Sequence, residues 1–599
     1  MYLFRSIQKN ISFIAMPFCF LKSNLLLFLV FLYVCLPVIA QEKEEETIQT
    51  ERVIVVKPYT PTISDAFKVK ATPVLEDSIV QNKKEITYSI FSVPVASTFT
   101  PAKGKAENID PPKKIPLFDN YATLGVGNYT SALAEFYSNF QVSRTDNIGV
   151  YLHHNSSQGG IDDVRLDDKF YNTFLDANYT SRTKDFTYGF EAGVEHQLYN
   201  WYGLPDIPVV SNEELSMIDP QQNYFGAKLG GKFIFEDLIF KNVKLDYRYF
   251  GDALSSRENR FIANSTLAFE LEATRITTDV HIDFLKGNFE RELQTGIENN
   301  YQILNLGVQP SFQIVKDDLS LDIGAEVVYS VDSQREENNL YFYPKVTASY
   351  RLINDLFIGY GGLEGGLYQN SYRDAVQTNP FVSPDLVLTP THQQLEAYVG
   401  IKGKISDIIS YNVRGSFQTE EDKPLFIHNI ENRGSSIRNR EGFDYGNSFS
   451  YRYDDIQTVS AYAELNFDIN RKFKLGVTGD FYSYETDNEE KAWNLPEIKI
   501  SISSNYQINE QWSAGAQLFY VGERFEVDNT INFNNNEPQP FVTIDSYLDA
   551  NLNIGYRINE QWSVFAKGNN LLGNMYERWL HYPVQGIQVL GGVTYKFNW

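Results

Sequence analysis

The stretch LDANLNIGYRI, residues 548–558, alternates between apolar and polar side chains along its whole length. Leu548 and Ile554 belong to its apolar set and Asp549 to its polar set, and VSAYAELNFDI, residues 459–469, repeats the pattern. Successive side chains of a β-strand point to opposite faces, so both stretches are predicted strands. Their length fits a tilted strand crossing a bilayer, which needs about 9–11 residues, with an apolar face toward lipid and a polar face toward a lumen. The alternative is a soluble sandwich or barrel, whose strands are usually shorter, about 5–6 residues.

Short polar turns of similar sequence recur between the predicted strands, at residues 143–146, 181–184, 353–355, 469–471, 508–510 and 558–560. The hexamer INEQWS occurs at 508–513 and again at 558–563. It places Trp512 and Trp562 just inside a strand start, which is typical of an interfacial aromatic girdle. Long polar loops alternate with these turns, at residues 157–167, 200–221, 369–388, 420–446, 486–495, 523–543 and 571–587.

The alternation of turns and loops serves as a check on the strand count, because outer-membrane barrels have short periplasmic turns and long outer loops. A consistent count needs 287–300 to be an outer loop and 447–470 to be one long strand. The sequence therefore predicts an all-β, transmembrane antiparallel β-barrel of about 22 strands, within a range of 20–24. An even number returns both ends of the barrel to the periplasmic side.

The chain ends in GGVTYKFNW, residues 591–599. Val593, Tyr595, Phe597 and Trp599 share one face of this predicted last strand. We expect this apolar, aromatic-terminated stripe to face lipid and to be the signal that the barrel assembly machinery recognises. Lipid offers no partner to an unpaired strand edge, so the sheet must close on itself.

The first forty residues have the features of a secretory signal peptide. Basic residues precede an apolar run at 25–34, and Val38-Ile39-Ala40 offers a cleavage site before Gln41. A start at Met16 instead of Met1 would bring the leader into the usual range of about 15–30 residues; the alternative is an N-terminal membrane anchor. Both cysteines, at positions 19 and 35, fall inside this leader, so closure of the barrel must replace disulfides as the source of stability.

Composition and motifs exclude several other functions. The formal charge of −24 argues against a nucleic-acid partner, because phosphate binding needs a basic face. We find no catalytic, cofactor or metal motif, so the chain is predicted not to be an enzyme. His153 and His154 are adjacent on a predicted strand and face opposite sides. The acidic clusters at 162–168 and 485–490 lack a calcium-loop spacing, and Trp201, Tyr202 and Trp579 are expected to pack within loops rather than to stack on a ligand.

Several stretches resemble the barrel of a TonB-dependent receptor of the Bacteroidota type. They are NLLGNMYE (570–577), YPVQG (582–586), GVTYKF (592–597), Leu495-Pro496 before a strand and FYVGER (519–524). The resemblance covers about residues 120–599. It implies an outer-membrane location in a Gram-negative bacterium and transport or gating of a solute.

The N-terminal part departs from this family, which usually carries a folded plug domain before the first strand. Here only residues 41–119 are available, and eight of the 23 prolines fall in them: Pro58, Pro61, Pro73, Pro94, Pro101, Pro111, Pro112 and Pro116. That density predicts a short, extended periplasmic or lumenal segment and no plug. Within it, Val53, Ile54, Val55 and Val56 faintly resemble the box that binds TonB by strand addition; a plain edge strand or tether is the alternative.

A lumen of about 22 strands is wide and is ordinarily plugged. Residues 41–119, infolded long loops or a partner subunit are the candidates to fill it. The predicted function is a plugless transporter or gate, and the alternative is a structural or assembly subunit of a larger outer-membrane complex. Outer-membrane lipid is the predicted environment, and residues 41–119 are predicted to contact TonB or another envelope subunit.

Overall fold

The computed structural model describes residues 117–205, 215–236, 239–271, 274–290, 298–431, 440–528 and 540–599. The leader, the segment up to residue 116 and the TonB-box-like residues Val53, Ile54, Val55 and Val56 therefore lie outside the described residues. Within the described part, no helix is both long and apolar enough to cross a membrane.

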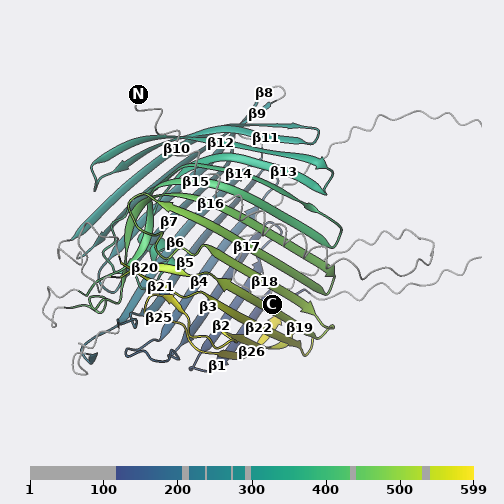
Figure 1. Cartoon of the computed structure of the whole chain (residues 1–599). Helices are drawn as coiled ribbons and strands as arrows, with labels where there is room; N and C mark the ends of the chain where they lie inside the picture. The colour runs from purple at the N-terminus through teal and green to yellow at the C-terminus, as the bar shows by residue number, and fades with distance from the viewer. Residues whose placement is uncertain are drawn as a thin grey trace, which may run out of the picture. The chain divides into compact units, whose positions relative to one another are not determined.

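One antiparallel sheet of 22 strands forms the wall of a closed barrel, as predicted. Its strands follow one another in chain order with a common tilt (Figure 1), and the sheet closes where the first strand pairs with the last. The wall strands are β1 (Asn120–Gly127), β2 (Ala132–Gln141), β3 (Asp146–Ser157), β4 (Phe170–Arg182), β5 (Phe186–Asn200), β6 (Gln221–Phe235), β7 (Phe240–Asp252), β8 (Arg257–Leu271), β9 (Thr274–Phe289), β10 (Asn299–Lys316), β11 (Leu319–Asp332), β12 (Glu337–Ile353), β13 (Phe357–Tyr368), β14 (Thr391–Lys404), β15 (Ile409–His428), β16 (Phe449–Asn470), β17 (Phe473–Thr486), β18 (Ile498–Gln507), β19 (Trp512–Val521), β22 (Tyr547–Arg557), β23 (Trp562–Asn569) and β26 (Gln588–Phe597).

The remaining helix and strands of the described residues belong to the outer loops. They are the helix α4 (Tyr372–Thr378), the hairpin of β20 (Arg524–Val527) and β21 (Phe541–Ile544), and the small pair of β24 (Glu577–Trp579) and β25 (Tyr582–Pro583). Strand β9 ends at Phe289 and β10 begins at Asn299, so the chain leaves the wall between them, and β16 is one long strand, as the alternation of loops required.

Two features of the outer loops differ from the prediction. Strand β15 continues to His428, past a register shift between Glu420 and Lys423, so the first residues of the predicted loop 420–446 belong to the wall. The extension is stable because Leu425 and Ile427 are buried against Trp493. In addition, the outer connections at 128–131, 253–256 and 333–336 are short, so loop length alone does not mark the outer end of every hairpin.

The periplasmic turns explain the repeated Ile-Asn motif. In the turn after β18, the Asn509 side-chain oxygen accepts hydrogen bonds from the backbone N–H groups of Gln511 and Trp512, both at 2.8 Å. Asn559 and Asn470 do the same in their own turns. An asparagine side chain in this position replaces the missing backbone partner and reverses the chain locally.

The aromatic girdle lies at the same end of the barrel. The Trp512 ring packs on Tyr556 with centroids 4.7 Å apart, and Trp562 packs on Tyr595 at 4.5 Å. Tyr595 continues the row through Phe597 to Trp599. Both Trp512 and Trp562 remain 42% exposed, which suits rings that meet lipid headgroups.

The seam between β1 and β26 is reinforced by side chains. The hydroxyl oxygens of Thr123 and Thr594 lie 2.9 Å apart across it, and the Asn120 side chain donates to the Phe597 carbonyl at 3.0 Å. Ser138 of β2 donates to the same asparagine at 2.6 Å. The last strand therefore completes a continuous hydrogen-bonded wall that leaves no open edge in lipid.

Candidate functional site

The outer loops share one buried aromatic core. Trp201, Phe381, Phe443 and Tyr582 come from four different outer loops and are all buried in it. The rings of Phe381 and Tyr582 stack with centroids 3.8 Å apart, and the Trp201 indole donates to the Phe381 carbonyl at 3.1 Å. These loops therefore pack against one another instead of extending separately into solvent.

This core contains the three outer-loop aromatics that the sequence singled out. Trp201 is 1%, Tyr202 9% and Trp579 8% exposed. The Tyr202 hydroxyl donates to the Pro583 carbonyl at 2.9 Å. The prediction that these side chains pack within loops is confirmed, and none of them presents a free face to a ligand.

Loop 369–390, between β13 and β14, folds into the barrel. Its helix α4 touches the inner faces of strands on another part of the wall, since the Tyr372 ring packs against Phe250 of β7 and Phe289 of β9, with centroids 5.4 and 5.0 Å apart. Beyond the helix, the Pro380 carbonyl accepts a hydrogen bond from Tyr224 of β6 at 2.8 Å. The loop therefore occupies part of the lumen, and infolded loops were one of the three candidates to fill it.

The start of α4 is held by one buried carboxylate, Glu258 of β8. Its oxygens accept hydrogen bonds from the backbone N–H of Tyr372 at 2.6 Å and of Arg373 at 3.3 Å, and from the Tyr301 hydroxyl at 2.9 Å. The Ser371 side chain caps the helix by accepting from the backbone of Asp374 at 3.1 Å. A carboxylate and a cap together satisfy the N–H groups that a helix start leaves unpaired.

Two ion pairs join the same helix to the wall. Arg373 makes a two-pronged contact with Glu195 of β5, at 2.8 and 3.1 Å. Arg260 of β8 contacts Asp374 at 3.0 Å and also forks onto Asp283 of β9 at 2.7 and 3.0 Å. Paired guanidinium–carboxylate contacts of this kind fix orientation as well as position. The loop is thus anchored on its far side to β5, β8 and β9.

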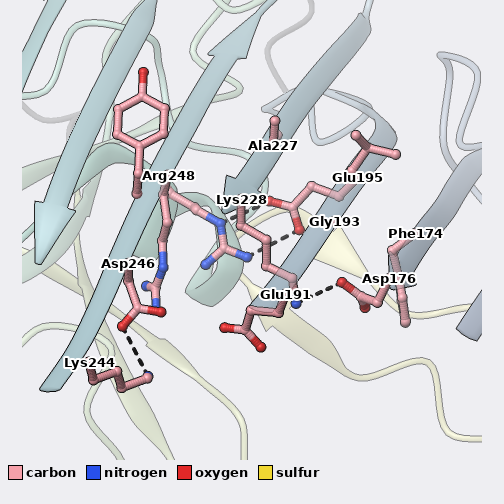
Figure 2. Close-up of a pocket in the computed structure, with 14 residues that line it drawn as sticks. Phe174, Asp176, Glu191, Gly193, Glu195, Ala227, Lys228, Lys244, Asp246 and Arg248 are labelled. Atoms are coloured by element: carbon pink, nitrogen blue, oxygen red, sulfur yellow. Dashed lines mark hydrogen bonds and ion pairs between the residues drawn. The ribbon is translucent and has the colours of Figure 1, made fainter. Parts of the chain in front are cut away.

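Below this anchored loop, the inner wall of β4 to β7 forms a hollow of about 340 Å³. It is lined by four carboxylates and four cationic side chains, namely Asp176, Glu191, Glu195, Asp246, Lys228, Lys244, Arg248 and Arg373. Figure 2 shows most of them, with Lys228 directed to Asp176 and Lys244 to Asp246. A second hollow, with Lys232, Lys241, Lys244 and Arg275 in its lining, lies further along β6 to β9. These hollows and the loop above them are the candidate functional site.

The structure separates the two adjacent histidines, as predicted. His153 lies 3.2 Å from a Glu135 carboxylate oxygen, while His154 bonds to Thr173 at 2.8 Å and Ser156 at 3.1 Å. The described residues contain no group of three or more side chains placed to hold a metal ion.

The predicted C-terminal signal residues lie on the closing strand. Val593 pairs in register with Leu124, which is 63% exposed, so this side of the strand faces outward. Trp599, just beyond β26, is 76% exposed. Their role in assembly stays a prediction.

Sequence reasoning missed Glu258, Arg260 and Arg373 as a group, because each contact that joins loop 369–390 to the wall through them links residues 114 or more positions apart. One local signal was available: Ser371-Tyr372-Arg373-Asp374 has the serine and acidic residue spaced as in a helix start. It could have indicated a short helix inside the loop, although not where that helix docks.

The sequence matches no known protein-family profile. The fold, in contrast, matches solved outer-membrane receptors. The ferripyoverdine receptor of Pseudomonas aeruginosa aligns with a TM-score of 0.59 at 13% identity, covering 81% of this chain and 72% of the receptor. The siderophore receptor PirA from Acinetobacter baumannii gives 0.59 at 12%, and the copper transporter OprC gives 0.57 at 14%, each over 81% of both chains. At such identities the likeness shows the fold alone, which is a closed barrel of 22 strands like the barrels of these outer-membrane receptors.

Proposed function

We propose that this chain is a TonB-dependent-receptor-type transporter of the Bacteroidota kind, which passes or gates a solute across the outer membrane. The observation that carries the proposal is the inward-folded loop 369–390, anchored over a charged hollow in the wall of a 22-stranded barrel. A purely structural barrel has no need of a charged inner recess beneath an ion-paired loop. The similar solved proteins include a ferripyoverdine receptor, a siderophore receptor and a copper transporter, which supports transport as the class of activity.

Passage through this barrel requires the outer loops to move. The shared aromatic core joins four loops at the outer end, so a solute reaches the hollow only when contacts such as Phe381 on Tyr582 separate. The ion pairs of Arg373 and Arg260 hold loop 369–390 in the closed position. In this proposal the loop is the gate and no folded plug domain is needed.

The segment before the barrel is the part of the chain that would couple transport to an energy source. We propose that residues 41–119 contact TonB, through Val53 to Val56, or another envelope subunit. The prolines of this segment favour an extended tether, and strand addition is the mode by which such a tether binds a partner.

Planar-bilayer recording with the purified full chain tests the proposal. We expect brief, rare openings in the native protein and frequent openings after replacement of residues 370–388 by a short Gly-Ser linker. A deletion of residues 41–116 is the second arm. A barrel that stays silent in all three forms, and takes up no solute in liposomes, would overturn the transport proposal.

A structural or assembly role is the second candidate. It is favoured by the continuous core over the outer mouth, in which Tyr224, Phe289 and Phe449 are fully buried. Such a core would suit a barrel that serves as a rigid scaffold. Native purification in mild detergent distinguishes this role, because a scaffold should retain partner proteins that are lost on deletion of residues 41–116, whereas recovery of the chain alone counts against it.

A further inference from the structure

The hollow beneath Arg373 has a floor made by glycines. Gly193 of β5 and Gly226 of β6 line the hollow, and Gly230 of β6 lies beside it on the same inner face of the wall. A Cβ atom at any of these positions would come closer than 3.0 Å to a charged side chain that lies flat across it. At Gly226 that side chain is Glu195, and at Gly230 it is Glu191. The glycines therefore create room for carboxylates to lie along the wall and leave a recess in front of them.

Most charges of the recess neutralise one another. Lys228 lies 2.7 Å from Asp176, and Lys244 lies 3.0 Å from Asp246. The third pair is Arg373 with Glu195, described above. These pairs hold their members in fixed positions, so they form the frame of the recess and are not available to recognise a charged solute.

One carboxylate and one guanidinium are left over. Glu191 and Arg248 line the same recess, and neither has an ion pair within the part of the chain that the structure describes. Glu191 is exposed to the lumen and Arg248 is half-buried. Figure 2 shows both within the group of charged side chains that surrounds the recess. A solute entering this space meets one free negative and one free positive group.

We propose that the recess binds a zwitterionic solute, an amino acid or short peptide, with its ammonium group at Glu191 and its carboxylate at Arg248. This inference rests on the proposed transport function and names its substrate class. The volume of about 340 Å³ is at the small end of ligand sites, about 300–1,000 Å³, and suits a solute of this size. The neighbouring hollow carries Lys232, Lys241 and Arg275, which would receive a carboxylate leaving the recess toward β8 and β9.

Calorimetric titration of the purified full chain in detergent tests the proposal with three probes. They are L-alanyl-L-alanine, its C-terminal amide, which keeps only the ammonium, and its N-acetyl form, which keeps only the carboxylate. Loss of one hydrogen-bonded charge should weaken binding about tenfold or more. We therefore expect the dipeptide to bind at least tenfold more tightly than either derivative.

Two variants assign each end of the solute. The Glu191→Gln variant should bind the dipeptide no more tightly than it binds the N-acetyl dipeptide. The Arg248→Gln variant should bind the dipeptide no more tightly than it binds the dipeptide amide. Glu364→Gln, which changes an inner-face carboxylate on β13 outside the recess, should bind as the native chain does.

The proposal would be overturned by no binding of the dipeptide, by equal binding of all three probes, or by unchanged selectivity in both variants. Preferential binding of the N-acetyl form would instead place an anion at the cationic hollow and would also overturn it. Because binding is measured without passage through the membrane, its failure is distinguishable from failure of transport, which the bilayer recordings report independently.

Discussion

Replacing Tyr372 by alanine should release loop 369–390 from the wall. The Tyr372 side chain is fully buried between Phe250 and Phe289, and its hydroxyl donates to Asp252 at 2.7 Å. Truncation of a buried aromatic ring costs about 3–5 kcal/mol. The hydroxyl adds only about 1 kcal/mol, because Asp252 keeps hydrogen bonds from the backbone N–H groups of Leu254 and Ser256, both at 2.9 Å.

The docking equilibrium should therefore shift by about 5 kcal/mol, which corresponds to three to four powers of ten. Tyr372→Phe keeps the ring and loses only the hydroxyl, so it should shift the same equilibrium by about tenfold or less. Tyr329→Ala, which removes an aromatic from the outward face of β11, is the matched control and should leave the loop docked.

Hydrogen exchange of peptides spanning residues 371–379 measures the effect directly. The amides of Ala375 and Asn379 are bonded within the helix at 3.0 and 2.8 Å and exchange only when the loop opens. Unchanged protection in Tyr372→Ala, or an equal loss in the Ala and Phe variants, would refute the view that ring packing holds the loop in the lumen. In planar bilayers, the same variants should rank in the same order by opening frequency.

Three further predictions concern the outer loops, the turns and assembly. Burial raises the pKa of Glu526 in the outer hairpin to about 7 against an ordinary 4.5, so the protonated form is favoured in the fold. Docking of β20 and β21 should therefore weaken as pH rises through 7, by about 2 kcal/mol between pH 5 and pH 8. Hydrogen exchange at the Val527 amide, corrected for intrinsic rates, measures this effect, and Glu526→Gln should remove it. Asn559→Ala should lower the free energy of unfolding by about 1 kcal/mol in urea titrations of the barrel refolded in vesicles, whereas Asn559→Asp, which keeps the accepting oxygen, should not. Phe597→Ser should reduce the heat-modifiable barrel recovered from outer membranes more than Tyr506→Ser does, and equal losses would contradict a special role for the last strand.

The sequence by itself determined the wall of this protein. Strand alternation, turn chemistry and the aromatic residues at strand starts are local properties of the sequence. A strand that crosses lipid also has a narrow range of lengths and side-chain patterns. For that reason the local sequence was enough to predict the strands at 459–469 and 548–558 and the turns at Asn509 and Asn559. The strand count followed because the two ends of a barrel carry different loops.

Only the tertiary structure showed that loop 369–390 folds into the lumen. Glu258 meets Tyr372, and Glu195 meets Arg373, because closing the sheet brings β5 and β8 opposite a loop that is attached to β13 and β14. No local pattern distinguishes a loop that folds inward from one that extends outward, since both are polar and both end in strands. The same holds for Glu191 and Arg248, because only the tertiary structure shows that the other six charged side chains of the recess pair with one another and that these two have no ion pair among the described residues.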